Sequence, residues 1–439
     1  MSQGLTGWLD RVSLVSGPLP VVAAVLALLG AGWLVAARRR WFLRWALPAA
    51  LTGAAVATAV IYLVVEKVWR PFPDPVATAV YVWIGIGIAA LLLVVPRCVA
   101  GRRATIPVAI VAATAVVLTA AVQINQIFYA YPTVGTALGL PDPDRMDAAQ
   151  LPDPSGPVVT GRPLEPVWAP QAPTDLPGSG RYTTVPIPAT TSGFTARDAV
   201  VYLPPAYFAS PRPLLPVLVL LAGQPGSPED WLHGGKLAAT MDEFARTHHG
   251  LAPVVVVADG TGSQFANPLC LDSALGNVAT YLTVDVPAWT KTHLQIDPDP
   301  RSWAVAGLSY GGTCALQLAT TRPDVYPTFL DLSGQLEPTL GDRKRTVDEA
   351  FGGNTAAFTA VNPMDLLATR RYPDTAGVFV VGDHDDAYRG DLQKVYAAAQ
   401  NAGMDVRFVE VPGTHSFLVW SAGLRTELGW LATRLGLTA

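Results

Sequence analysis

The sequence predicts a two-part protein, in which a helical membrane domain precedes an α/β domain with a mostly parallel sheet. Half of its 439 residues are apolar and only 15% are charged, whereas about 25% is usual in a soluble domain. Charge is also uneven, with 10 Lys and Arg against 3 Asp and Glu up to residue 125, and 20 against 31 beyond it. From residue 181, strand-length apolar runs alternate with helix-length segments. The expected parts are a four-span domain over 1–125, a linker over 126–180 and the α/β domain over 181–439.

Four apolar runs in the first part are long enough to cross a bilayer core of about 30 Å, which takes roughly 20 helical residues. They cover residues 18–37, 43–65, 76–96 and 105–125. A spanning segment must close its backbone hydrogen bonds internally, so each run is expected to be a helix. A signal peptide followed by buried core helices fits less well, because four such runs follow one another with Arg clusters between them.

The basic residues between the spans predict the orientation of the domain in the membrane. Arginines dominate the first and third connections: Arg38, Arg39, Arg40, Arg44, Arg97, Arg102 and Arg103. The second connection has Lys67 and Arg70 beside Glu66 and Asp74. Because loops rich in Lys and Arg stay in the cytoplasm, the C-terminal domain is expected to be extracytoplasmic on a multi-pass cell-membrane protein.

Residues 126–180 are expected to form an extended linker. Eleven prolines recur there without helical or alternating periodicity. Such a composition is typical of segments with polyproline-like conformation. A linker of this kind would keep the C-terminal domain near the bilayer.

In the C-terminal part, near-continuous apolar runs predict strands that are buried on both faces. These runs cover residues 199–203, 217–222, 254–258, 303–306, 329–332, 378–381 and 406–411. Helix-length segments lie between several of them, at 235–248, 279–293, 312–322 and 391–402. This alternation predicts an α/β sheet covered by helices.

A Gly-x-Ser-x-Gly motif lies where one of these strands ends, with Ser309 between Gly307 and Gly311. The glycines permit a sharp strand-to-helix turn that lifts the serine hydroxyl above the sheet. The helix after the motif directs its N-terminal dipole toward a developing negative charge. Strand before and helix after favour a nucleophile over a purely structural turn.

A serine nucleophile needs a base, and six histidines are available. His415 follows the last predicted strand, where the α/β-hydrolase fold delivers its histidine. The other five are expected to be exposed or locally hydrogen-bonded: His233, His248, His249, His293 and His384.

The base in turn needs a carboxylate to orient it. Three aspartates follow the strand at 378–381, and the order Ser, Asp, His along the chain is that of α/β-hydrolases. Asp385 is the expected acid and Asp386 the reserve, whereas Asp383 is expected to cap the turn.

The tetrahedral intermediate of acyl transfer needs two N–H donors for its oxyanion. The amide after the nucleophile, on Tyr310, is the first by position. The second is expected from the loop after the strand at 217–222, on Gln224, because Pro225 has no N–H.

The three cysteines include no CxxC pair, so a Cys-rich zinc site is excluded and no metal or cofactor is expected. Cys98 borders an apolar run. Cys314 begins the helix after Ser309 and Cys270 lies in a loop at the same end of the sheet, so these two form a disulfide if their Cα atoms approach within about 4.4–6.8 Å. Two buried free thiols are the alternative.

These motifs resemble the esterase D family of α/β-hydrolases, which includes feruloyl esterases, S-formylglutathione hydrolase and the mycobacterial antigen mycolyltransferases. The resemblance covers residues 181–439 and is carried by three runs: GLSYGG at 307–312, GDHD at 382–385, and PGTHSF at 412–417 with Trp420 after it. It implies a metal-independent serine acyl-transfer mechanism. The four-span domain is a departure from the secreted mycolyltransferases.

The favoured function is a membrane-anchored serine esterase acting on a lipid-linked substrate, since tethering raises the effective concentration of esters held at the same surface. Aminoacyl esters of phosphatidylglycerol are one candidate, because an acidic domain tolerates a cationic head group. A mycolyltransferase-like acyltransferase to a sugar or lipid hydroxyl is the first alternative, and a non-catalytic membrane scaffold is the second. The bilayer is the expected partner. Nucleic acid is not, because the positive charge lies in short clusters between apolar runs.

Overall fold

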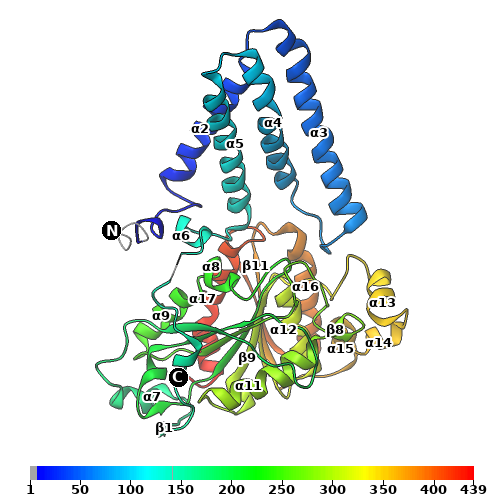
Figure 1. Ribbon diagram of the computed structural model, residues 1–439. Coiled ribbons are helices and arrows are strands. Elements are labelled where there is room, and N and C mark those ends of the chain that lie inside the picture. The colour runs from blue at the N-terminus through cyan, green and yellow to red at the C-terminus, as the bar shows by residue number, and fades with distance from the viewer. Residues whose placement is uncertain (1–6, 141) are drawn as a thin grey trace. The chain divides into compact units, whose positions relative to one another are not determined.

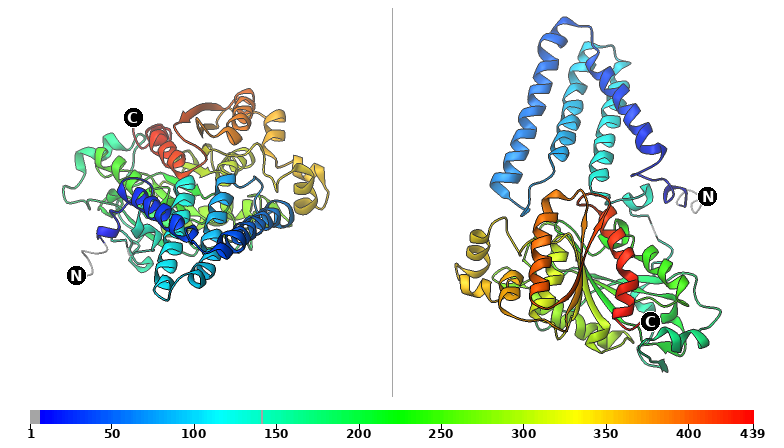
Figure 2. Two further views of the ribbon diagram at one scale, coloured as in Figure 1. Left: turned by 90° about the horizontal axis from the view of Figure 1, so that it is seen from above. Right: turned by 180° about the vertical axis from the view of Figure 1, so that it is seen from behind.

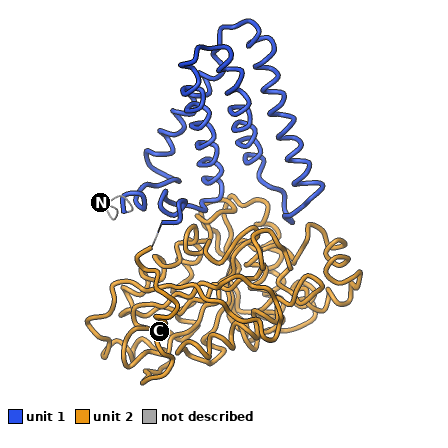
Figure 3. Tube along the Cα trace, viewed as in Figure 1, with its two compact units in different colours: residues 1–140 blue, residues 141–439 orange. Residues whose placement is uncertain are grey.

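The computed structural model describes residues 7–140 and 142–439. Its internal contacts divide the chain into two compact units, the helical unit over residues 1–140 and the sheet unit over residues 141–439 (Figures 1 and 3). The boundary follows the last long apolar helix, so the change in composition along the sequence coincides with a change in architecture.

Among the described residues of the helical unit, four helices are long and apolar enough to cross a membrane, which confirms the predicted fold of this part. They are α2 (Pro18–Val35), the helix Phe42–Trp69 that contains α3 (Leu47–Leu63), α4 (Thr78–Ala100) and α5 (Thr105–Phe128). Proline occupies the first turn of α2, where its missing N–H costs no intrahelical bond. The short α6 (Val134–Ala137) follows.

Small residues bring these helices together. The buried face of α5 consists largely of alanines, and α2 and α4 both pack against this helix. A Cβ on Gly30 of α2 would lie 2.9 Å from the Ala112 carbonyl oxygen, so the two backbones approach closely. Large apolar side chains point outward instead: Leu28, Leu29, Val68, Val95, Val99, Val111 and Leu118. Such an outer surface suits contact with lipid chains.

The two ends of the helical unit meet. The Leu14 N–H donates to the Pro132 carbonyl oxygen at 2.9 Å, and the Val134 N–H donates to the Val12 carbonyl oxygen at 2.9 Å. The segment before α2 and the segment after α5 therefore lie at the same end of the bundle, as an even number of spans requires.

The described residues of the sheet unit form an eight-stranded sheet in the order β12-β11-β10-β9-β5-β6-β3-β2. Its strands are β2 (Arg181–Val185), β3 (Ala199–Leu203), β5 (Val217–Leu221), β6 (Val254–Ala258), β9 (Trp303–Leu308), β10 (Thr328–Leu332), β11 (Ala376–Gly382) and β12 (Asp405–Val411). Neighbours from β12 to β6 run parallel, whereas β3 is antiparallel to both β6 and β2. The predicted mostly parallel sheet is confirmed.

Helices cover both faces of the sheet because successive strand residues point to opposite sides. The Phe379 ring of β11 meets the ring of Tyr396 on α16 (Asp386–Asn401) at 6.0 Å. Next to it, Val380 packs against Gly423 of α17 (Phe417–Arg434). Figure 2 shows α16 and α17, orange and red, on opposite sides of the last strands.

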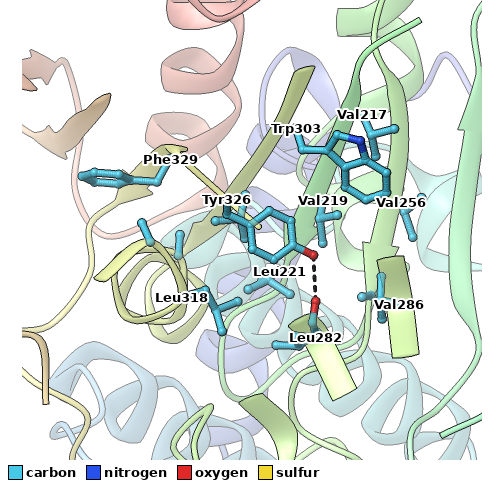
Figure 4. Packing of buried hydrophobic residues seen from close by; sticks show 14 of the residues in the cluster. Val217, Val219, Leu221, Val256, Leu282, Val286, Trp303, Leu318, Tyr326 and Phe329 are labelled. Atoms are coloured by element: carbon cyan, nitrogen blue, oxygen red, sulfur yellow. Dashed lines mark hydrogen bonds between the residues drawn. The ribbon is translucent and has the colours of Figure 1, made fainter. Parts of the chain in front are cut away.

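The core on the face of the sheet that α16 covers is aliphatic with a few large rings. Val219 and Leu221 of β5 and Leu318 of α12 (Tyr310–Thr321) are buried there around Tyr326 (Figure 4). The buried Tyr326 hydroxyl donates to the Leu282 carbonyl oxygen at 2.7 Å, so this polar atom is satisfied inside the core.

The remaining elements connect the strands or lie at the edges of the sheet unit. The helices are α7 (Glu165–Trp168), α8 (Asp230–His233), α9 (Leu237–Thr247), α10 (Val278–Thr280), α11 (Val286–His293), α13 (Arg343–Phe351), α14 (Thr355–Thr359) and α15 (Pro363–Thr369). Short strand pairs join β1 (Val158–Val159) to β4 (Arg212–Pro213) and β7 (Asp272–Ser273) to β8 (Gly276–Asn277).

The segment expected to be an extended linker, residues 126–180, differs from that expectation. Its first residues complete α5, and residues from 141 onward belong to the sheet unit. Val159, Leu164 and Trp168 are buried in the core of that unit, and the Trp168 indole N–H donates to the His249 carbonyl oxygen at 3.0 Å. This part of the chain is therefore packed on the sheet unit, because apolar side chains between its prolines enter the core.

Candidate active site

The candidate catalytic residues all lie at the carboxyl edge of the sheet, where ligands bind in open α/β sheets. Ser309 follows β9, Asp385 follows β11, His415 follows β12, and Gln224 follows β5. Parallel strands bring these chain segments to one edge although they are far apart in the sequence.

Ser309 has the backbone strain of a nucleophile elbow. Its φ of 52° and ψ of −118° are unusual for a residue with a Cβ. The Ser309 N–H donates to the Leu332 carbonyl oxygen at 2.8 Å, which ties the turn to β10. A Cβ on Gly311 would lie 2.6 Å from the Ala222 carbonyl oxygen, so only glycine lets α12 start this close to β5.

The structure brings Ser309, His415 and Asp385 into one line of hydrogen bonds. His415 Nε2 lies 3.0 Å from Ser309 Oγ, and His415 Nδ1 lies 2.9 Å from Asp385 Oδ2. The Asp385 side chain is only 2% exposed, whereas the imidazole is 24% exposed. The arrangement can pass a proton from the serine hydroxyl to the imidazole while the carboxylate holds the ring.

The other two aspartates of the acid loop have different positions. Asp383 Oδ1 accepts the Gly413 N–H at 2.8 Å and so fastens the acid loop to the loop that carries His415. This hydrogen bond, together with one to the His384 side chain, lowers the pKa of Asp383. Asp386 is exposed in the first turn of α16. Of the three, Asp385 is the one hydrogen-bonded to His415.

The loop after β5 lies beside the nucleophile, as the oxyanion assignment requires. A Cβ on Gly223 would lie 3.6 Å from the Cβ of Ser309. Gln224 is held there by its side-chain amide, which donates to the Phe265 carbonyl oxygen at 2.8 Å. Tyr310, the other expected donor, is the first residue of α12.

An ion pair between a buried carboxylate and a partly exposed guanidinium, which the sequence did not indicate, contacts this loop. Arg197 Nη2 lies 2.8 Å from Asp259 Oδ1 and also donates to the Gly226 carbonyl oxygen at 2.9 Å. Burial acts to raise the pKa of Asp259, but the hydrogen bonds from Arg197 outweigh it and hold that pKa below its ordinary value. No local motif marks either residue, because the pair joins two loops that only the fold brings together.

The start of α12 is tied to the loop after β6. The Tyr310 hydroxyl donates to the Gly260 carbonyl oxygen at 2.9 Å and accepts the Cys270 N–H at 2.8 Å. Cys270 and Cys314 are joined by a disulfide, with their Cα atoms 5.6 Å apart. Burial raises the pKa of the Tyr310 hydroxyl, so it stays protonated in these contacts.

A second buried carboxyl lies behind the elbow. Asp331 on β10 is fully buried, and its Oδ1 accepts the Gly334 N–H at 2.7 Å. Burial raises its pKa to about 7. A Cβ on Gly312 would collide with this carboxyl, so Asp331 packs directly under the turn after the nucleophile.

Several of the remaining histidines have local partners, as expected. His248 lies 2.8 Å from the Phe244 carbonyl oxygen, and His293 lies 2.9 Å from the Trp289 carbonyl oxygen, each within its own helix end. His384 Nδ1 lies 2.6 Å from Asp383 Oδ1. Within residues 7–140 and 142–439, no three His, Cys, Asp or Glu side chains converge as a metal site would require.

This sheet, with a strained serine after β9 and a hydrogen-bonded histidine and aspartate at the same edge, defines an α/β-hydrolase. Residues 195–431 match the esterase family model, described as "Putative esterase". An uncharacterised protein of Corynebacterium glutamicum is 41% identical over 405 residues, which cover 90% of this chain and 91% of that protein. The chain belongs to the esterase family, and it is a hydrolase or an acyltransferase.

The solved structure of an esterase shares the fold of the sheet unit. A ferulic acid esterase superposes with a TM-score of 0.50 at 18% identity and covers 60% of this chain and 100% of its own. An S-formylglutathione hydrolase from Agrobacterium tumefaciens has a TM-score of 0.49 at 18% identity, with 60% and 98% covered. By contrast, the 405-residue match to the C. glutamicum protein is longer than residues 141–439, so it extends into the helical unit.

Proposed function

We propose that this chain is a membrane-anchored, extracytoplasmic serine esterase that hydrolyses an ester of a lipid-linked substrate. Ser309, His415 and Asp385 are its catalytic residues. The observation that carries the proposal is the line of hydrogen bonds from Ser309 Oγ to His415 Nε2 at 3.0 Å and from His415 Nδ1 to Asp385 Oδ2 at 2.9 Å.

In the proposed first step, Ser309 Oγ attacks the ester carbonyl carbon while His415 Nε2 accepts the hydroxyl proton. The intermediate collapses to an acyl-serine, and the imidazolium returns the proton to the departing alcohol. In the second step, water attacks the acyl-serine and gives a proton to His415. The second tetrahedral intermediate then collapses, and the imidazolium returns this proton to Ser309 Oγ as the carboxylic acid leaves. Asp385 keeps Nδ1 protonated throughout, so that Nε2 stays free to act as the base.

The negative charge that develops on the carbonyl oxygen needs donors at the same edge. The backbone amides of Tyr310 and Gln224 are the proposed pair, and the closeness of Gly223 to Ser309 supports the second. Amides held by the surrounding loops need no reorganisation as the charge forms, which is why such donors contribute strongly to catalysis.

The substrate class follows from the attachment and the charge of the chain. Four apolar helices would hold the sheet unit at a bilayer surface, where the local concentration of lipid esters is high. Residues after 125 carry 31 Asp and Glu against 20 Lys and Arg, so a cationic head group is electrostatically acceptable. Aminoacyl-phosphatidylglycerol meets both conditions and is the proposed candidate.

Activity-based labelling combined with lipid analysis tests the proposal. A fluorophosphonate probe should label the full chain and a Ser421→Ala control, and Ser309→Ala should prevent labelling. Cells that carry Ser309→Ala should accumulate the substrate, and the purified enzyme should hydrolyse aminoacyl-phosphatidylglycerol in vesicles. Hydrolysis of other lipid esters alone would overturn the candidate substrate. Preferential transfer of the acyl group to added alcohols would identify an acyltransferase instead.

A further inference from the structure

The imidazole of His415 is held between aromatic side chains that the proposed mechanism does not use. The Tyr388 ring lies parallel to it, with centroids 3.8 Å apart and an angle of 11° between the planes. The Trp420 ring lies nearly perpendicular to the imidazole, at 4.9 Å and 87°. These contacts fix the plane of the ring independently of its hydrogen bonds.

The stacked ring and the acid come from one turn of helix. Asp385 is the N-cap of α16, and the Tyr388 N–H donates to the Asp385 carbonyl oxygen at 3.1 Å. Any shift of this turn would therefore move the carboxylate and the aromatic face together. Other histidine stacks in this chain, such as Phe244 with His248, join neighbours on one helix. The stack of Tyr388 on His415 joins α16 to the loop after β12 and depends on the tertiary fold.

An aromatic face distinguishes between the two protonation states of the imidazole. The face of an aromatic ring carries negative potential and attracts a cation placed over it. Imidazole is neutral before Ser309 attacks and becomes imidazolium as the tetrahedral intermediate forms. The attraction between the Tyr388 ring and the imidazole is therefore stronger once the imidazole is protonated. Such a contact stabilises the transition state more than the bound substrate, and so it lowers the barrier to acyl transfer.

We propose that Tyr388 is a positioning residue of the catalytic site, which acts through His415 by orienting the imidazole and by stabilising the imidazolium with its ring face. The inference rests on the proposed function, because it requires His415 to be the base. The ring, and not the hydroxyl group, carries the effect.

Substitution at residue 388 separates this electronic role from simple packing. With a soluble chromogenic ester, Tyr388→Leu should lower kcat by roughly 2- to 30-fold with little change in KM, the range of a cation–π contact. Tyr388→Phe should retain most of the wild-type kcat. Pentafluorophenylalanine at residue 388 has the shape of Phe but a reversed ring potential, so it should be as slow as the Leu variant. Tyr396→Leu, on the same helix but in contact with Phe379 and Phe408, is the matched control.

The outcomes separate the two proposals. Equal kcat values for Phe and pentafluorophenylalanine at residue 388, with Ser309→Ala inactive, would overturn the role of Tyr388 and leave the proposed function standing. If Ser309→Ala kept its activity, the proposed function would fail, and the role of Tyr388 would fall with it. The thermal unfolding midpoint of each variant shows whether a loss of rate comes from misfolding, and the isosteric pair decides the matter even if the Leu variant does not fold.

Discussion

At the scale of single residues, the strained conformation of Ser309 has a function only if its hydroxyl reacts, and this leads to the first prediction. Ser309→Ala and His415→Ala should each lower the hydrolysis of a soluble ester by about 10³-fold or more. The double variant should be scarcely slower, because the two groups act as a unit at a separation of 3.0 Å. Steady-state kinetics on the purified full chain measures this, and near-normal turnover in His415→Ala would contradict the triad.

The second prediction ranks the three aspartates of the acid loop. Asp385→Asn should lower kcat most, by about 10⁴-fold, because an amide no longer holds the imidazole in the required tautomer. Asp383→Asn should have a smaller effect through the Gly413 contact, and Asp386→Asn, exposed in the first turn of α16, should have little. A larger loss in Asp386→Asn than in Asp385→Asn would move the acid by one residue.

The third prediction concerns the pH dependence of stability. Burial raises the pKa of Asp331 from 3.8 to about 7, so between these values the folded chain keeps a proton that the unfolded chain has lost. Stability should therefore fall as the pH rises through this window, by up to about 4 kcal/mol. Asp331→Asn keeps an oxygen for the Gly334 N–H but cannot ionise, so it should remove this decline.

Chemical unfolding of the full chain in detergent, repeated from pH 4 to pH 7, measures the effect of Asp331. The difference in unfolding free energy, variant minus wild type, should grow in favour of the Asn variant as the pH rises. Parallel curves for the two proteins would show that Asp331 is ionised in the folded state and that its burial costs little.

At the scale of elements, α12 is the part of the sheet unit on which the site depends most. It begins at the nucleophile, and both the Tyr310 hydroxyl and the Cys270–Cys314 disulfide fasten it to the loop after β6. These contacts limit movement of the elbow. Helix α12, which is fastened at its start, thus holds Ser309 in its strained backbone conformation.

The disulfide gives the fourth prediction. In unreduced, denatured protein only Cys98 should react with a thiol reagent, and three reactive thiols would rule out the bridge. Replacing Cys270 and Cys314 together by Ser should lower stability by about 2–4 kcal/mol, because the bridge closes a loop between residues 44 positions apart. The unfolding midpoint of this variant should fall, whereas its kcat on a soluble ester should stay close to the wild-type value.

The residues of the site that follow directly after a strand could be predicted from the sequence. Ser309, Asp385 and His415 each follow an apolar run, and parallel pairing of such runs brings their ends to one edge. Residues that act across loops leave no such pattern. The pairing of Arg197 with Asp259 and the stack of Tyr388 on His415 depend on tertiary contacts, and the proline-rich composition of 141–180 conceals that Trp168 is buried in the core.

At the scale of the whole molecule, orientation follows from pairing and charge together. Hydrogen bonds between residues 12–14 and 132–134 bring both ends of the helical unit to one side. The arginines between the first and second helices and between the third and fourth belong to the opposite side, and we propose on the basis of their positive charge that this side faces the cytoplasm. The proposed orientation therefore has the sheet unit, which begins at residue 141, outside the cytoplasm.

The last prediction tests this orientation and the substrate class together. A protease site inserted at the boundary between residues 140 and 142 should be cleaved by protease added to intact, wall-stripped cells. Complete protection there, with cleavage only after lysis, would reverse the topology.

Cleavage of the purified protein should leave the hydrolysis of a soluble ester unchanged, because the catalytic residues all lie in the sheet unit. It should sharply lower the hydrolysis of a bilayer-embedded ester, because the local concentration provided by the spans is lost. Equal rates on the embedded ester before and after cleavage would show that the enzyme does not draw its substrate from the membrane that holds it.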